Sequence, residues 1–233
     1  MTHLALASIT IVSVNVGRPT LLVKWPNHEV MSSIDKCPVE VSSVWLSRTN
    51  LEGDEQADQR PTQDGRVHGG PEKAVYAYPA DHFAAWSEEL GRPVGPGLFG
   101  ENLTALGITE TAACIGDVWD WGDALLQVRQ PRLPCYKLGY RIGKQVWRKR
   151  FRESGRTGWY LSVIREGQVP TQGTIKVVDR HAARVTVAEV VRAVDRPAVA
   201  DQRIRTLSVL PAGLRRLLAQ AERDHAGGIP ESD

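Results

Sequence analysis

The sequence predicts a mainly β protein in which short strands form a β-barrel, followed by a small helical extension. Strand-like runs separated by glycine-rich turns, with few helices between them, fill most of the chain, which is typical of a β-barrel. After His181 the apolar residues change to helical spacing. We therefore expect a β-barrel domain over residues 1–180 and a three-helix extension over residues 181–233, with a frayed tail from Gly227.

The first third of the chain predicts two strands and two long connections. In residues 4–16, apolar side chains occupy both odd- and even-numbered positions, which indicates a strand buried on both faces. A second strand is expected over residues 38–46. The turn-forming stretch 17–35 between them is expected to be a surface connection. Residues 50–66 are too polar to bury themselves, so they are predicted to form a loop.

A helix and several strands are predicted in the centre of the chain. Pro79 suits the first turn of a helix, Phe83, Trp86 and Leu90 lie on one face of it, and Gly91 ends it. Turn signals then separate apolar runs with strand character. The strands expected from these runs cover residues 118–121, 124–129, 157–165 and 173–179.

Four further helices are predicted, one before the extension and three within it. The first covers residues 143–153, and Gly155 stops it. Its expected inward residues are Val146, Trp147 and Phe151. Thr186 and Glu189 have the spacing of a capping box, which opens the first helix of the extension. The other two are expected over residues 201–207 and from Leu210 onward.

Composition and cysteine spacing exclude several classes of protein. With 24% charged residues and a net charge of +2, the chain shows no bias toward nucleic acid or membranes. Cys37, Cys114 and Cys135 are odd in number and far apart, which argues against a disulfide framework or a zinc site. Scattered thiols suit a reducing compartment. With no signal peptide or membrane span evident, a cytoplasmic location is expected.

The turn at residues 130–135 is the first candidate site. Two prolines stiffen it and deliver Cys135 after a predicted strand. Arg132 and Lys137 are near in sequence, and positive charge favours the thiolate, which is the nucleophile and the soft metal ligand. The alternative is that Cys135 is a small buried apolar residue.

Six blocks of sequence, in order, resemble the MOSC domain, a family named after the C-terminal domain of molybdenum-cofactor sulfurase. The blocks are Gly53-Asp54-x-Gln56-x-Asp58, His68-Gly69-Gly70-x-x-Lys73-Ala74-Val75, Gly100-Glu101-Asn102-Leu103, Gly116-Asp117, Pro131-Arg132-x-Pro134-Cys135 and Gly155-Arg156-x-Gly158-Trp159-Tyr160. The predicted helices at the C-terminus resemble the three-helix extension of the stand-alone bacterial members.

The resemblance implies a fold, a cofactor and an activity. Such members imply a β-barrel, a bound molybdopterin cofactor with a cysteine on molybdenum, and reduction of N-hydroxylated compounds such as base analogues. By position in its block, Cys135 matches the metal-binding cysteine of the family. A thiolate suits such a redox-active metal and tunes its potential.

Five further residues are candidates for the same pocket. Arg132, Lys73 and Arg156 are candidates for the pterin phosphate and ring edge, because guanidinium and ammonium groups bind phosphate. His68 is a candidate to donate a hydrogen bond or relay a proton. Asn102 is a candidate for the amide edge of the pterin. The alternatives are surface ion pairs for the three cations, a loop carbonyl contact for His68 and a turn cap for Asn102.

Two acidic residues and one basic run are expected to have structural roles. Asp54 and Asp58 are expected to order their loop rather than act as catalytic acids. The basic residues of the 143–153 helix are expected to form a solvated face, part of which is a candidate dock for an acidic electron donor. This run consists of Lys144, Arg148, Lys149, Arg150 and Arg152.

Three functions remain open from the sequence. The first is a molybdenum enzyme that reduces N-hydroxylated small molecules. The second is a carrier that passes on the cofactor or its sulfur without turnover, and the third is a structural module in which Cys135 only packs. The three cysteines are too few and too spread for an iron–sulfur cluster, so the enzyme needs a separate electron-donor protein. The helical extension is a candidate dock for that donor or for a second copy in a homodimer.

Overall fold

Seven strands close into a barrel in the computed structural model, which describes residues 8–57, 69–196 and 200–226. Their order is β12-β8-β9-β10-β6-β7-β1, and β1 closes the ring because it pairs with both β7 and β12. β6 and β7 are parallel, whereas the other neighbours in the ring are antiparallel. The strands are β1 (Ser8–Val16), β6 (Val75–Pro79), β7 (Leu103–Leu106), β8 (Val118–Trp121), β9 (Ala124–Pro131), β10 (Trp159–Arg165) and β12 (Thr174–Asp179).

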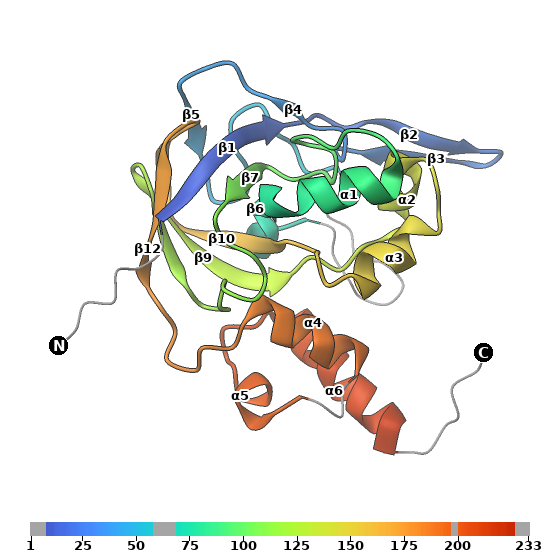
Figure 1. Cartoon of the computed structure of the whole chain (residues 1–233), viewed down its shortest axis with the longest axis vertical. Helices are drawn as coiled ribbons and strands as arrows, with labels where there is room; N and C mark the ends of the chain where they lie inside the picture. Colours follow the sequence, from blue (N-terminus) through green and yellow to red (C-terminus); the bar gives the residue numbers. More distant parts are fainter. Residues whose placement is uncertain (1–7, 58–68, 197–199, 227–233) are drawn as a thin grey trace.

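Smaller elements surround this barrel (Figure 1). Short strands form a hairpin of β2 with β3, a pair of β5 with β11, and an addition of β4 to β1. Their bounds are β2 (Thr20–Trp25), β3 (His28–Ser32), β4 (Cys37–Pro38), β5 (Ser43–Leu46) and β11 (Gly167–Pro170). The helices are α1 (Phe83–Leu90), α2 (Tyr136–Ile142), α3 (Trp147–Glu153), α4 (Val187–Asp195), α5 (Gln202–Arg205) and α6 (Ala212–Ala226), with 3-10 turns η1 (Pro71–Lys73) and η2 (Ala80–His82).

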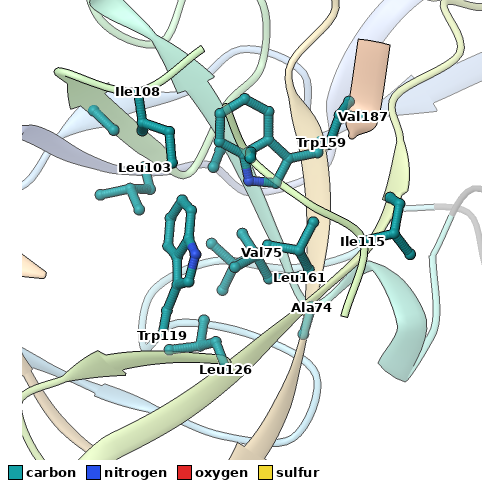
Figure 2. Close-up of a cluster of buried hydrophobic side chains, with 14 of the residues drawn as sticks. Ala74, Val75, Leu103, Ile108, Ile115, Trp119, Leu126, Trp159, Leu161 and Val187 are labelled. Carbon is teal, nitrogen blue, oxygen red and sulfur yellow. The ribbon is translucent and has the colours of Figure 1, made fainter. Parts of the chain in front are cut away.

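The barrel interior and the helical extension share one apolar core. Trp119 and Trp159 meet edge to face inside the barrel, with ring centroids 5.9 Å apart. Figure 2 shows Val187, the first residue of α4, in the same cluster as these rings. Leu214 and Leu218 of α6 also belong to it. The helices therefore complete the core of the barrel.

A second apolar cluster lies under α1, α2 and α3 and supports the turn that carries Cys135. Trp86 of α1 stacks on Phe151 of α3 with centroids 5.6 Å apart, and Phe99 packs against both rings. Leu138 of α2 is fully buried in the same cluster. Aromatic packing of this kind fixes the positions of the three helices.

The fold class and most predicted elements are confirmed, including the capping box, in which Thr186 and Glu189 each accept from the other's backbone N–H. Two strand predictions were wrong. The strand at residues 4–16, described from Ser8, is not buried on both faces: Val12 is 44% exposed, and a bulge follows Ile11. The expected strand at 38–46 is split into β4 and β5 by a bend, where polar residues interrupt the apolar pattern.

Other differences lie near the candidate site. The stretch predicted as a surface connection, 17–35, contains the β2–β3 hairpin, which turns at Pro26 and Asn27. α2 was not predicted, and neither was β11. Val146, predicted to face inward, is 68% exposed because α3 begins only at Trp147, which leaves Val146 at the helix boundary. Among the described helices, none is both long and apolar enough to cross a bilayer.

Candidate functional site

One pocket collects residues from four separate connections of the chain. They come from the segment after β3, the loop at 54–57, the loop before β7, and the turn between β9 and α2; η1, β6 and β10 add the remaining wall. Of the residues predicted from sequence, Cys135, Arg132, Lys73 and Asn102 all line it. The barrel therefore brings together four predicted residues that are up to 62 positions apart, from Lys73 to Cys135.

The turn after β9 presents Cys135 to this pocket. The backbone N–H of Arg132 donates to the carbonyl of Gly158 at 3.1 Å, which keeps the turn against β10. Cys135 itself is extended, with φ −109° and ψ 175°, and α2 begins at the next residue. Its side chain is partly exposed and reaches the pocket lining. The position suits a thiolate that binds a ligand from the pocket side.

Arg132 is a buried cation whose hydrogen bonds are incomplete. The residue is 5% exposed, and its guanidinium lies 5.2 Å from the ring centroid of Tyr76 and 5.3 Å from that of Phe151. Burial opposes the charge, but Tyr76, Tyr160 and Cys135 raise the pKa of Arg132 overall. Its Nη1 has no hydrogen-bond partner within the described residues. A buried donor left without a partner indicates a missing ligand or water.

Lys73 is the last residue of η1 and also lines the pocket. Its Nζ lies 5.7 Å from the ring centroid of Tyr160, within reach of a cation–π interaction. Gln56 holds the preceding turn, because its side chain accepts from the N–H of Gly70 at 2.5 Å and donates to the Gly70 carbonyl at 3.4 Å. Gly70 has φ +96°, a conformation that favours glycine. Burial raises the pKa of Tyr160, so its phenol stays protonated beside both cations.

The side-chain amide of Asn102 forms hydrogen bonds within the protein. Its Nδ2 donates to Oδ2 of Asp54 at 2.9 Å and to the carbonyl of Asn15 at 3.3 Å. Its Oδ1 accepts from the backbone N–H of Tyr76 at 3.2 Å. Asn102 therefore braces β1, β6 and the loop at 54–57 on the pocket floor. Asp54 orders its loop, as predicted, by accepting from the N–H of Gly17 at 2.8 Å.

Two predicted residues have other positions. Arg156 is absent from the described pocket lining: it pairs with Glu89, and its guanidinium lies 3.9 Å from the ring centroid of Trp86. This contact stabilises the packing of α1 against the segment before β10. His68 lies outside the described residues, as does Asp58, so both predictions about them stay predictions.

Sequence reasoning missed several polar residues of the pocket, of which Lys36 and Ser33 are the most informative. Lys36 is buried, forms an ion pair with Asp54, and has its pKa lowered by burial, against the effect of Asp54. Ser33 also lines the pocket, and its Oγ is buried without a hydrogen-bond partner among the described residues. Ser33 lies in the stretch 17–35 that was predicted as a surface connection, and Lys36 directly follows that stretch; single polar residues carry no signal there. Lys137, considered only as a nearby charge, is also in the lining and donates to the Met31 carbonyl at 3.2 Å.

Glu101 shapes the pocket wall from behind. This carboxyl is fully buried and accepts from the N–H of Gly97 at 2.7 Å, the N–H of Phe99 at 3.1 Å and the hydroxyl of Thr104 at 2.9 Å. Burial raises its pKa to about 7. Because Phe99 and Gly100 line the pocket, Glu101 holds the backbone that forms this wall.

The fold and this pocket define a class of closed β-barrel proteins in which a thiol and several cationic side chains line one pocket. Residues 64–180 match the family model described as "MOSC domain". The chain therefore belongs to the MOSC domain family, as its sequence blocks predicted.

Individual relatives agree with this assignment. The chain is 39% identical over 178 residues to the uncharacterised protein YflK of Bacillus subtilis (strain 168), covering 76% of this chain and 77% of YflK. It is 40% identical over 162 residues to the protein YiiM of Escherichia coli (strain K12), covering 68% of each. The crystal structure of YiiM from Geobacillus stearothermophilus superimposes with a TM-score of 0.73 at 32% identity, covering 91% of this chain and 98% of that one.

A fungal relative has a longer chain. A protein named "Reductase" from Gibberella moniliformis (strain M3125 / FGSC 7600) is 35% identical over 157 residues. The match covers 65% of this chain but only 26% of the fungal protein.

Proposed function

We propose that this protein is a molybdenum-cofactor-dependent reductase of N-hydroxylated compounds. The observation that carries the proposal is Arg132: its buried guanidinium lines the same pocket as Cys135, and its Nη1 has no hydrogen-bond partner among the described residues. Such a group calls for an anionic ligand, and a thiol at the same pocket supplies a soft metal donor. Membership of the MOSC family and the name of the fungal relative support a redox role.

The residues present fit the cofactor. Cys135 would bind the metal through its thiolate. Arg132 and Lys73 would bind the phosphate of the cofactor, together with the Ser33 hydroxyl, which has no hydrogen-bond partner within the described part of the chain. Asn102, which the sequence suggested for the pterin edge, would act instead through the floor that it braces. When bound, the cofactor supplies the two-electron chemistry that removes oxygen from an N–OH group.

The residues of the chain itself would position the substrate and supply protons to its departing oxygen. The overall reaction converts N–OH to N–H and water, and it consumes two electrons and two protons. The Tyr160 phenol, kept protonated by burial, and the Lys36 ammonium both line the pocket, where each can hold a proton for the departing oxygen. His68 remains a proposed proton donor. We also retain a cytoplasmic location and a separate electron-donor protein as parts of this proposal.

Turnover of the purified protein tests the proposal. The protein should be produced in a host that makes the cofactor and then incubated with 6-N-hydroxylaminopurine and dithionite-reduced methyl viologen. We expect adenine to form, and we expect the C135S variant to form none while C37S, which changes an exposed thiol elsewhere, retains activity. Bound molybdenum without turnover would favour the carrier function instead, and the absence of molybdenum would rule out both.

A further inference from the structure

A surface patch at the junction of α2 and α3 combines exposed apolar groups with uncompensated positive charge. We call it the α2–α3 patch, and it consists of Tyr140, Lys144, Val146, Arg148 and Lys149. Val146 is 68% exposed and Tyr140 is 38% exposed, which is unusual for apolar side chains next to a packed helix pair. The patch was not part of the site described above.

The cations of this patch differ from the neighbouring cations on α3 in how they are paired with acidic side chains. Arg150 pairs with Glu89, and Arg152 pairs with Asp195. Lys144 and Arg148 are exposed and have no acidic partner within the described part of the chain. Lys149 has only a distant contact, 3.8 Å, with Glu153. The net positive charge therefore faces solvent around Val146.

The patch is close to the thiol of the pocket. α2 begins immediately after Cys135 and has seven residues, so it spans only about 10 Å at 1.5 Å per residue. α2 and α3 lie beside each other at one side of the barrel (Figure 1). Leu138 and Phe151 pack both helices into one cluster, which makes the path between patch and pocket short and rigid.

We propose that the α2–α3 patch docks an acidic electron-carrier protein that delivers the two electrons of the reaction. This inference rests on the proposed function. An apolar centre with a positive rim suits a small, transient redox complex, in which opposite charge steers the encounter. The carrier is oxidised as N–OH is reduced to N–H and water, and both protons come from solvent through the pocket. A one-electron carrier docks twice in each turnover to deliver the two electrons.

Two other occupants fit less well. A second copy of this chain in a two-fold contact would place the same face against itself, and so bring Lys144 and Arg148 against like charges. The helical extension, which the sequence left open as a dock, also carries exposed cations, Arg215 and Arg216. These two arginines supply a matched control for the experiment.

Charge reversal with two electron sources tests the inference. The holoprotein, K144E/R148E and R215E/R216E should be assayed with 6-N-hydroxylaminopurine. Electrons should come either from dithionite-reduced methyl viologen or from an acidic [2Fe–2S] ferredoxin kept reduced by its NADPH-dependent reductase. We expect equal dye-driven turnover in all three. With ferredoxin at low salt, kcat/KM for the carrier should fall about tenfold or more in K144E/R148E only, and added salt should lower the wild-type value toward that of the variant.

Each other result has a definite meaning. If the dye drives no turnover in wild-type holoprotein, the proposed function fails, whatever the patch does. If the dye works but ferredoxin does not reduce the wild type, or reduces K144E/R148E equally well, the docking proposal is overturned. A loss confined to R215E/R216E would place the carrier on the helical extension and would also overturn it.

Discussion

Arg132 has an unusual place for a permanent charge, because it lies between two aromatic rings and its Nη1 finds no hydrogen-bond partner in the part of the chain that the structure describes. A buried polar group without a partner costs about 1–3 kcal/mol. A ligand oxyanion that accepts a hydrogen bond from Nη1 would remove this cost. The protein with the ligand bound would then be more stable than the empty protein. The stability of the empty protein and its affinity for the ligand are therefore expected to respond in opposite ways to changes at this residue.

Replacement of Arg132 by methionine tests this expectation. R132M keeps an unbranched apolar stem between the rings and removes the unsatisfied charge. We expect the cofactor-free variant to be as stable as wild type or more stable in urea unfolding, while the molybdenum content falls sharply. R156M is the control: it should cost about 1–3 kcal/mol by removal of the Glu89 pair and the Trp86 contact, with molybdenum retained. A fully loaded R132M protein would contradict the assignment.

At the scale of elements, the loop between residues 97 and 100 depends on one buried carboxyl. Glu101 accepts three hydrogen bonds from this loop and from β7, yet burial raises its pKa from 4.5 to about 7. The folded state therefore binds the proton more tightly than the unfolded chain does. Protonation of Glu101 therefore contributes stability that is fully present below pH 4.5 and is lost as the pH rises to about 7.

The E101Q variant isolates this effect. Relative to E101Q, the unfolding free energy of wild type should fall as the pH rises from 4.5 to 7. The shift should be about 3 kcal/mol at most, because one pKa unit corresponds to about 1.4 kcal/mol. Urea unfolding of both proteins at several pH values measures it. A difference that stays constant with pH would show that Glu101 is not the titrating group.

At the scale of the whole molecule, the barrel and the helical extension share a core. All seven tryptophans lie before residue 160, so their fluorescence reports on the barrel and its covering helices and not on the extension. Leu214 of α6 is 4% exposed and belongs to the same apolar cluster as Trp119 and Trp159. If the core is continuous, damage in α6 must lower the stability that the tryptophans report.

The L214A variant measures this coupling. Loss of a buried leucine side chain costs about 2–5 kcal/mol. We expect the urea midpoint of tryptophan fluorescence to fall in L214A and to stay unchanged in R215A, which alters the exposed neighbour. An unchanged fluorescence midpoint in L214A would mean that the extension unfolds separately from the barrel.

The same scale shows what the sequence can and cannot reveal. Strand runs bounded by glycine turns and the Thr186 capping box are local patterns, so they were predictable. Lys36 and Ser33 acquire their roles only when the β2–β3 hairpin and the segment after it fold over the pocket. Arg156 and Arg132 have the same side-chain chemistry, but Arg156 pairs with Glu89, whereas Nη1 of Arg132 has no partner among the described residues. Such differences depend on distant partners.

Cys135 is assigned as the ligand of a bound metal, and the most direct test of this assignment is the molybdenum content of purified protein. Wild type and C37S, both produced in a host that makes the cofactor, should contain molybdenum in proportion to protein by plasma mass spectrometry. C135S should lack it, because serine does not replace the soft thiolate donor. Equal molybdenum in all three proteins, or its absence from wild type, would contradict the assignment of Cys135 as the metal ligand.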